Sequence, residues 1–459
     1  MARSRGTGYL LGIDNGSQST KVAVFDERGA VHARARVPLR PSDSPRPGVV
    51  EHPDDDLWDS IGAATRAALR DFDGEPGEIR GVGLCTIRSC RALLRADGTL
   101  AQPVLSWMDE RVSRPYEHVD PAVRHVTTSS GYITARLTGQ FRDTAANYRG
   151  EWPIDLGSWD WVDDPGIPRR MLFDLVLPGD QLGTVTADAA ARTGLPEGLP
   201  VFATANDKAV EALGSGLGDD RTALLSMGTY IAGMTAGAHG VRDAEAFWTN
   251  FACRPHEYLY ESHGIRRGMW TVSWLRDLLG SEDRLNEGAA GVPAGSDGLI
   301  AVLDWLAPVD KPFRKGAFLG FDGRQGPFHL YRAVLEAIAL TTCANVRDMA
   351  AELGTGFERV LVSGGGAESD VLVQVIADAF ARPARRAPGG AALGAAICAG
   401  AGLGSFGGFD EAVAAMVHPG EEFRPDPAAH ERYRELGEVH RRLRTHTDPL
   451  FAWLATTGR

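Results

Sequence analysis

Cysteine is scarce in this chain. Its 459 residues include five cysteines, odd in number and scattered along the sequence: Cys85, Cys90, Cys253, Cys343 and Cys398. Such spacing matches neither a disulfide framework nor a zinc site. With no disulfides to maintain, the composition fits a reducing compartment such as the cytoplasm.

Excess positive charge and long apolar runs are also lacking. The formal net charge is -12 at pH 7, which argues against a nucleic acid or an anionic membrane surface as a partner. No run of about 18 apolar residues could span a bilayer, and the opening residues, MARSRGTG, lack the apolar core of a signal peptide. We therefore expect a cytoplasmic protein with no nucleic-acid or membrane partner.

What the chain does contain is typical of a globular protein. Hydrophobic residues make up 43% of the sequence and charged residues 24%, which is an ordinary balance. A length of 459 residues exceeds what one ordinary core accommodates, so we expect two domains.

The most informative stretch is residues 10–25. An apolar run ends at Asp14, a turn rich in glycine and hydroxyl groups follows, and apolar residues resume at Val22. This pattern predicts a β-hairpin with a tight turn. A third strand, from Val31 to Val37, follows before any helix. That order disfavours a Rossmann domain, which needs strand, turn and helix in succession.

The turn of this hairpin has the chemistry of a phosphate site. Gly16 lets the backbone approach a ligand closely, and Ser17, Ser19 and Thr20 supply hydroxyl and backbone N–H groups that can hold phosphate oxygens. Asp14, at the end of the first strand, could hold Mg²⁺ through water. We interpret the stretch as a nucleotide-phosphate turn.

The same pattern recurs in the second half of the chain. An apolar strand from Ala223 to Ser226 is followed by a glycine and hydroxyl turn, Met227 to Tyr230, and by a returning strand, Ile231 to Thr235. The repetition predicts two related domains that each present a phosphate turn to a shared cleft. The glycine-rich run from Gly214 to Asp220 is a candidate hinge between them.

Asp207 is the candidate general base. It follows a short strand, Pro200 to Ala203, and begins a helix, so its carboxylate could face the cleft. The alternative is that Asp207 only caps that helix, which is the commoner role for an aspartate in this position. Arg88 and Trp107 are candidates for contacting a polyol; a surface ion pair and core packing are their alternatives.

A second nucleotide signal follows the strand Val360 to Val362. Three consecutive glycines lie between Ser363 and Ala367, and a helical pattern begins at Ser369. Strand, glycines and helix N-terminus in this order let the backbone approach a nucleotide. Further helices are predicted over residues 57–69, 129–137, 268–279, 328–353, 391–403 and 425–444.

Taken together, these stretches resemble the FGGY carbohydrate kinases of the sugar kinase–Hsp70–actin superfamily. Seven motifs match in the family's order and cover the chain from about residue 8 to residue 403: Gly12 to Lys21, Trp107-x-Asp109-x-Arg111, Asn206-Asp207, Ser226 to Thr229, Tyr331 to Glu336, Gly364 to Ala367 and Leu393 to Ala396. One such motif is a weak signal, whereas seven in order are a strong one. The chain looks most like a short branch of sugar kinases within the family.

The resemblance implies the fold and the activity. The fold class would be α/β, with two ribonuclease H-like (actin-like ATPase) domains, each a mixed β-sheet flanked by helices, around a central cleft. Residues 1–216 would form the sugar-binding and catalytic-base domain and residues 217–459 the nucleotide-binding domain. A C-terminal helix over about residues 425–455 would pack back across both. The activity would be ATP-dependent phosphorylation of a hydroxyl on a ketose, aldose or polyol, with ATP and Mg²⁺ bound.

The resemblance also implies residue roles. Asp207 would be the general base, and Asp14 would help to place Mg²⁺. Two turns would hold the ATP phosphates: Gly16, Ser17, Gln18, Ser19 and Lys21 in the first domain, and Gly228 and Thr229 in the second. The adenosine site would use Gly365, Gly366, Ala367 and Asp370, with Gly268 and Ser273 as weaker candidates. The sugar would contact Arg88, Ser89, Trp107 and Asp109, beside Asp207 and Lys208.

Two departures from the family's pattern leave the substrate open. The connection over residues 112–128 is much shorter than in typical relatives, so the sugar pocket is either more open or completed by a second subunit in a homodimer. Lys208 stands where many relatives have a small or amide residue, and it could lower the pKa of Asp207 or meet an anionic group of the substrate. A modified sugar or cyclitol is the alternative substrate, and a non-catalytic ATP-binding relative is the alternative function.

Overall fold

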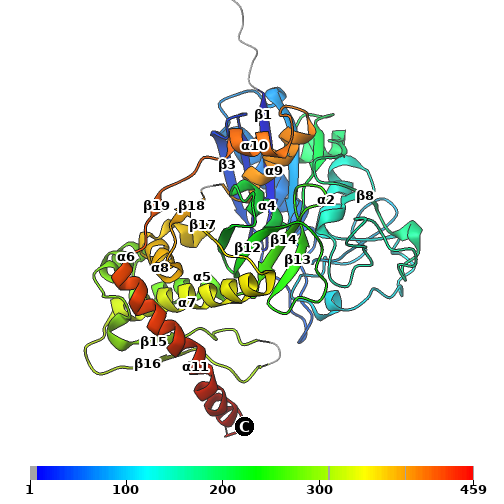
Figure 1. The fold of residues 1–459 in the computed structure, drawn as a ribbon. Helices are drawn as coiled ribbons and strands as arrows, with labels where there is room; N and C mark the ends of the chain where they lie inside the picture. The colour runs from blue at the N-terminus through cyan, green and yellow to red at the C-terminus, as the bar shows by residue number, and fades with distance from the viewer. Residues whose placement is uncertain (1–7, 309–310, 388, 458–459) are drawn as a thin grey trace, which may run out of the picture.

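Two β-sheets, one in each half of the chain, form the framework of the molecule (Figure 1). The computed structural model describes residues 8–308, 311–387 and 389–457. The first sheet has the strand order β3 (Val31–Pro38), β2 (Ser19–Phe25), β1 (Tyr9–Asn15), β4 (Ile79–Thr86), β10 (Pro200–Ala203) and β9 (Gln181–Thr184). Strands β3, β2 and β1 are antiparallel neighbours, and β4 and β10 continue parallel to β1.

The second sheet repeats this arrangement. Its order is β13 (Phe247–Phe251), β14 (Tyr258–Ser262), β12 (Ile231–Gly237), β11 (Thr222–Met227), β17 (Arg359–Ser363), β18 (Ala384–Arg386) and β19 (Glu422–Phe423). Again three antiparallel strands, here β14, β12 and β11, are followed by two parallel ones, β17 and β18. The predicted pair of related α/β domains and both predicted hairpins are confirmed.

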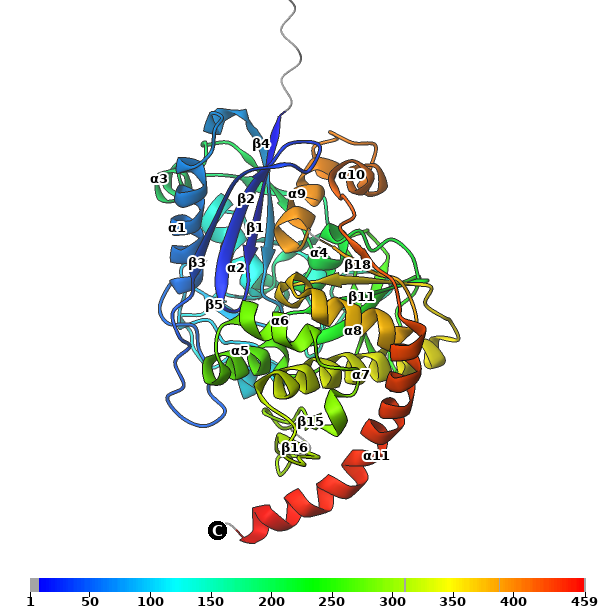
Figure 2. The same ribbon diagram turned by 90° about the vertical axis from the view of Figure 1, so that its left-hand side faces the viewer.

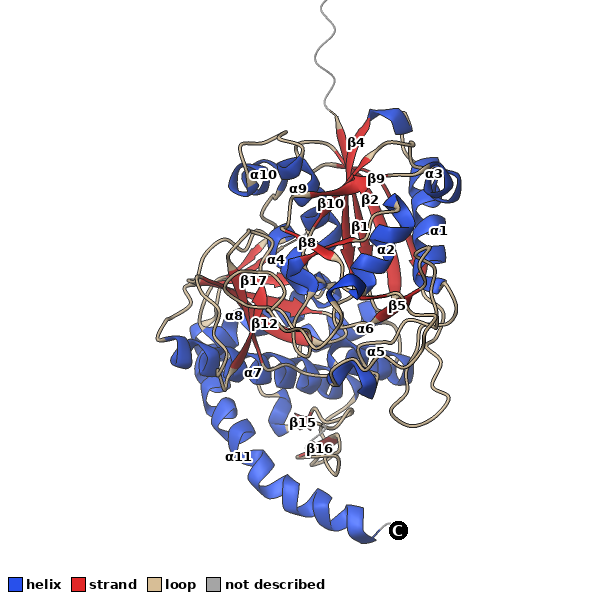
Figure 3. Cartoon of the chain, turned by 90° about the vertical axis from the view of Figure 1, so that its right-hand side faces the viewer, coloured by secondary structure: helices blue, strands red, loops and turns tan. Residues whose placement is uncertain are grey.

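Helices cover both faces of the first sheet (Figure 3). On one face lie α1 (Asp56–Arg70) and α2 (Ser129–Thr138), with α3 (Ala187–Thr193) beside them. On the other face lie α4 (Asp207–Gly214) and α9 (Ala391–Gly402), with α10 (Phe409–Met416) against α9. Alternating side chains of β1 serve the two faces: Leu11 and Ile13 pack with α1, and Leu10 packs on the opposite side.

One segment of the predicted second domain, residues 217–459, packs on the first sheet. Helices α9 and α10 lie far along the chain, in the segment assigned to the second domain, yet α9 packs on β1 and β4 of the first sheet (Figure 2). The sequence pattern of α9 indicates close packing because its residues are small, but it does not indicate the partner. The partner lies more than 300 residues away in the sequence.

Glycines in β1 and β4 allow α9 to approach the sheet. A Cβ atom at Gly12 would lie 1.9 Å from the carbonyl oxygen of Ala392, and one at Gly83 would lie 1.8 Å from that of Ala395. These obstacles are backbone atoms, which cannot rotate away, so no larger residue fits at either position without moving the helix.

We expect Gly83→Ala to destabilise the fold by about 3 kcal/mol, because the new methyl group would push α9 from the sheet. Denaturant unfolding measures the change. Gly77→Ala is the matched control, since a Cβ at Gly77 would meet nothing within 4 Å. Equal stability of the two variants would show that α9 does not pack against β4 as described.

The remaining long helices belong to the second half. They are α5 (Gly268–Leu279), α6 (Glu282–Ala290), α7 (Pro327–Leu353), α8 (Asp370–Phe380) and α11 (Pro427–Thr457). Helix α11 packs on α7 and α8, and its C-terminal part runs away from both sheets (Figure 2). The expected packing of this helix across both domains is thus not what its contacts show. No helix among the described residues is long and apolar enough to cross a membrane.

Three small two-stranded sheets complete the fold. They pair β5 (Ala92–Leu94) with β6 (His125–Thr127), β7 (Arg142–Thr144) with β8 (Asp174–Val176), and β15 (Ile300–Val302) with β16 (Ala317–Leu319). The loop after β7 reaches the second sheet: Trp159, 2% exposed, packs against Phe251 of β13 and Tyr258 of β14. This contact joins the two halves beside the polar residues described next.

Candidate active site

Asp207 begins helix α4, but it does not cap it. Asn206 is the N-cap, and its side-chain oxygen accepts hydrogen bonds from the backbone N–H groups of Lys208 and Ala209, each at 3.1 Å. The alternative that Asp207 serves as the cap is therefore wrong. Because Asn206 satisfies the helix end, the Asp207 carboxylate is left partly exposed, with 27% of its side-chain surface accessible.

The surroundings of Asp207 act on its pKa in both directions. Burial raises the pKa above its ordinary value, and the positive charges of Arg88 and Lys208 offset part of the rise. Arg88 Nε lies 3.7 Å from Asp207 Oδ1. The carboxylate is thus held near a guanidinium group, and its net pKa lies above that of a free aspartate.

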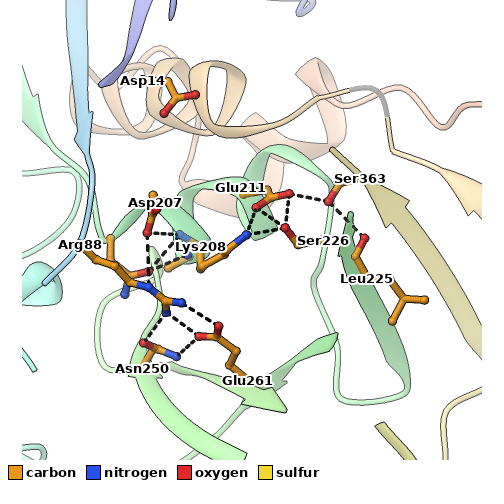
Figure 4. A network of polar contacts seen from close by, with 12 residues as sticks. Asp14, Arg88, Asp207, Lys208, Glu211, Leu225, Ser226, Asn250, Glu261 and Ser363 are labelled. Carbon is orange, nitrogen blue, oxygen red and sulfur yellow. Dashed lines mark hydrogen bonds and ion pairs between the residues drawn. The ribbon is translucent and has the colours of Figure 1, made fainter. Parts of the chain in front are cut away.

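Arg88 extends from the end of β4 to the second sheet (Figure 4). Its Nη1 and Nη2 donate to the two oxygens of Glu261 on β14, at 2.5 and 2.8 Å, and Nη1 also donates to Asn250 Oδ1 on β13 at 3.4 Å. Glu261 is fully buried. Burial raises the pKa of Glu261, but the charge and hydrogen bonds of Arg88 outweigh burial and lower it to about 2. The ion pair joins the two halves directly beside Asp207.

Lys208 points away from Asp207, towards the strand ends of the second sheet (Figure 4). Its Nζ donates to Ser226 Oγ on β11 at 2.5 Å and to Glu211 Oε2 at 3.1 Å. The Glu211 carboxylate also accepts from the hydroxyl of Ser363 on β17, at 2.7 Å. Lys208 and Glu211 therefore tie α4 to the ends of β11 and β17.

The hairpin turn of the second sheet is supported by two distant segments. The backbone N–H of Gly268, at the start of α5, donates to Thr229 O at 2.7 Å, and that of Met269 donates to Gly228 O at 3.1 Å. A Cβ atom at Gly364 would lie 2.8 Å from Met227 O, so the glycine-rich loop also packs on this turn. The structure brings together three of the predicted nucleotide segments.

The other predicted adenosine residues differ in their surroundings. Gly365, Gly366 and Ala367 form a short 3-10 turn before α8, and no atom lies within 4 Å of a Cβ built on Gly365. Ser273 is half-buried on α5. The carboxylate of Asp370 is exposed and paired with Arg386, whose Nε also donates to Ala367 O at 2.6 Å.

The first hairpin turn presents a different set of groups. Ser17 and Gln18 are exposed beside Gly16, whereas Ser19 Oγ accepts from Arg36 Nε at 3.1 Å. The Thr20 hydroxyl is buried between Asn15 and Ser60, so it supports the hairpin rather than a ligand. Asp14 is buried at the end of β1, and Lys21 Nζ lies 3.1 Å from its Oδ2.

Trp107 and Asp109 differ in their exposure to solvent. Trp107 is 39% exposed, whereas Asp109 is 1% exposed. The Asp109 carboxylate accepts from the backbone N–H of Val50 at 2.8 Å and from Nε and Nη2 of Arg111 at 2.8 and 2.7 Å. These bonds occupy both of its oxygens within the first domain. Ser89 is half-buried and adopts a positive φ of 60°.

Sequence models of a known family match both halves of this framework. The N-terminal domain of the FGGY family of carbohydrate kinases matches residues 9–122 and 105–214, and the C-terminal domain matches residues 223–403. The chain belongs to the FGGY family of carbohydrate kinases. It is therefore a carbohydrate kinase, and ATP and a small sugar are its substrates by family.

Individual relatives agree with the family. The chain is 46% identical to the "Uncharacterized sugar kinase YgcE" of Escherichia coli (strain K12), over 96% of this chain and 94% of that protein. A glycerol kinase of Delftia acidovorans is 28% identical over 88% of this chain and 92% of its own length. The crystal structure of xylulose kinase from Rhodospirillum rubrum superposes with a TM-score of 0.82 at 28% identity, covering 97% of this chain and 100% of that one.

Several polar residues of this FGGY chain were not found from the sequence. Glu211, Asn250 and Glu261 join the site, and so does Arg149, which donates from Nη1 to Asn250 Oδ1. Asn250 and Glu261 are buried in strands made mainly of apolar and aromatic residues, and a buried polar residue in such a strand needs a partner. That signal marks the residues but does not name their partners, since the partners lie in the other half of the chain.

Proposed function

We propose that this FGGY kinase transfers the γ-phosphoryl group of ATP to a hydroxyl of a small carbohydrate, with Asp207 as general base. The observation that carries the proposal is the position of the Asp207 carboxylate. Asn206 caps helix α4 in its place, and Arg88 Nε lies 3.7 Å from Asp207 Oδ1. An ionised carboxylate at this point can take the proton of the attacking hydroxyl.

The two hairpin turns are the proposed phosphate sites. Gly16 to Ser19 with Lys21 in the first domain, and Gly228 with Thr229 in the second, would hold the β- and γ-phosphates through N–H and hydroxyl groups. Because phosphoryl transfer depends on positioning and charge stabilisation, opposed turns and one base suffice. The glycine-rich loop Gly364–Gly366, packed on the second turn, would let the backbone line the nucleoside.

Asp14 fits a role in Mg²⁺ binding. Mg²⁺ in kinases is commonly held by one or two carboxylates together with phosphate oxygens, and a protein cage is not needed. Asp14 is a buried carboxylate at the first turn with Lys21 as its partner, and the described residues contain no group of three or more His, Cys, Asp or Glu suited to a metal. When bound, Mg²⁺ would neutralise charge on the transferring phosphates; Asp14 would orient it from the strand end.

The test is a screen for ADP release. The full-length protein with Mg²⁺ and ATP is incubated with panels of ketoses, aldoses, polyols and cyclitols. We expect at least one acceptor to raise ADP release well above the rate without acceptor. ATP binding without turnover on any acceptor would instead support a non-catalytic relative, and a cyclitol as the best acceptor would replace the simple sugar.

A further inference from the structure

We propose that the substrate carries a carboxylate and that Arg149 binds it, so that this kinase phosphorylates a sugar acid. The inference rests on the proposed function and narrows its substrate class. It comes from Arg149, whose guanidinium group shares a partner with that of Arg88 and keeps two donors that no described residue occupies.

Arg149 follows the short turn Ala145–Asn147, in the loop that packs on the second sheet. Its Nη1 donates to Asn250 Oδ1. Within the described part of the chain, its Nε and Nη2 have no partner, and neither atom is among the fully buried atoms that lack one. These two donors are therefore open to a ligand.

Nε and Nη2 form the edge of a guanidinium group that matches a carboxylate. Their N–H bonds are parallel, so they can donate to both oxygens at once. Arg314 uses the same two atoms in this chain, donating to the carboxylate of Asp448 at 2.8 and 2.5 Å. A hydroxyl group of a neutral sugar would satisfy only one of the two donors.

The other cations near Asp207 are already engaged. Arg88 directs Nη1 and Nη2 to Glu261 and its Nε towards Asp207. Lys208 donates to Glu211 and Ser226. The anionic group that the sequence suggested for Lys208 thus has a better site at Arg149.

The charges around Arg149 favour an incoming anion. Arg88 and Arg149 both donate to Asn250 Oδ1, and the neighbouring carboxylate of Glu261 is bound by Arg88. Burial, followed by the positive charge of Arg88, lowers the pKa of Arg149 to about 10. A negative group on Nε and Nη2 would offset both effects on the charge of Arg149, whereas a neutral group would add burial without a compensating charge.

The placement also fits a short polyol chain. Arg88 contacts Asn250, the partner of Arg149, through Nη1, and it approaches Asp207 through Nε. Arg149 and Asp207 therefore lie at two ends of the Arg88 guanidinium group. A linear sugar acid could place its carboxylate at Arg149 and a hydroxyl several carbons away at Asp207.

The test compares acceptors that differ only in the charged group. Aldonates of four to six carbons and alditols of matching configuration are assayed for ADP release with the full-length enzyme. We expect one aldonate to exceed its alditol in kcat/KM by about 10- to 100-fold, as a charged hydrogen-bonded pair contributes. Arg149→Met should remove that advantage, mainly through KM, so that the aldonate and its matching alditol have similar kcat/KM in the variant.

Controls separate this inference from the proposed function. Arg124→Met, at an exposed arginine of the same half, should leave the preference intact. Titration calorimetry of the same aldonate and alditol needs no turnover: aldonate binding that Arg149→Met abolishes supports the inference even if no ADP forms. Equal binding of the two acceptors, an equal loss of both in Arg149→Met, or a preference for a sugar phosphate would overturn it.

Discussion

Asp207→Asn is expected to reduce kcat by about 10²- to 10⁴-fold, the usual contribution of a general base. Asparagine keeps the size and the hydrogen-bonding shape of the side chain but cannot accept the hydroxyl proton. Since Asn206 caps α4, the helix should remain intact, and ATP affinity should change little. Single-turnover kinetics and equilibrium ATP binding measure the two effects separately.

The pH profile gives an independent readout of the same variant. A base must be ionised, and burial raises the pKa of Asp207 above its ordinary value. In the wild type, kcat/KM should therefore fall as the pH decreases through that raised pKa. In Asp207→Asn, the residual activity should lack this acidic decline.

Asp188→Asn is the matched control, because Asp188 is an exposed aspartate in the first turn of α3, away from the site. Its kinetics should equal those of the wild type. If Asp207→Asn retains wild-type kcat and the acidic decline, another group is the base.

The sequence predicted those features that depend on local pattern. Both hairpins have apolar runs interrupted by glycine and hydroxyl residues, and local turn chemistry determines such structures. The repeat of this pattern at Gly228 predicted the second domain. Asp207 was placed correctly at a helix start, because a short strand and a helical pattern flank it.

Features that depend on contacts between distant segments were not predicted. The packing of α9 on β1 and β4 requires that Gly12 and Gly83 lie against the backbone of Ala392 and Ala395. In the sequence, a glycine in a strand can have many other causes. Likewise, the sequence shows Glu261 as one glutamate in a strand, and its pairing with Arg88 becomes evident only in the structure. Such pairings depend on the three-dimensional arrangement, which local propensity and periodicity do not encode.

The candidate sugar residues show how a motif can combine two roles. Trp107 and Asp109 belong to one motif, yet Trp107 is exposed and the Asp109 oxygens are occupied by Arg111 and Val50. The aspartate thus holds the local backbone in place, and the tryptophan is the member with surface to offer a ligand. Residue type and spacing alone do not separate these roles.

Arg88→Met is expected to destabilise the protein by about 3–5 kcal/mol, because Glu261 would remain buried without the guanidinium group that binds both of its oxygens. Glu261 is fully buried on β14, so water cannot replace the lost guanidinium group. Denaturant unfolding measures the loss. Arg434→Met, at an exposed helical pair with Glu431, should change stability by less than about 1 kcal/mol.

A second substitution distinguishes a buried charge from lost packing. The double variant Arg88→Met, Glu261→Gln removes the unpaired charge, so it should recover much of the stability lost in Arg88→Met. The pH dependence has a defined sign. The pKa of Glu261 is lowered to about 2 in the folded protein, against about 4.5 when unfolded, so its stabilisation is complete above about pH 4.5 and is lost as the pH falls towards 2. Glu261→Gln should lack that loss. A double variant no more stable than Arg88→Met would mean that packing of the Arg88 side chain, rather than its charge, joins the two domains.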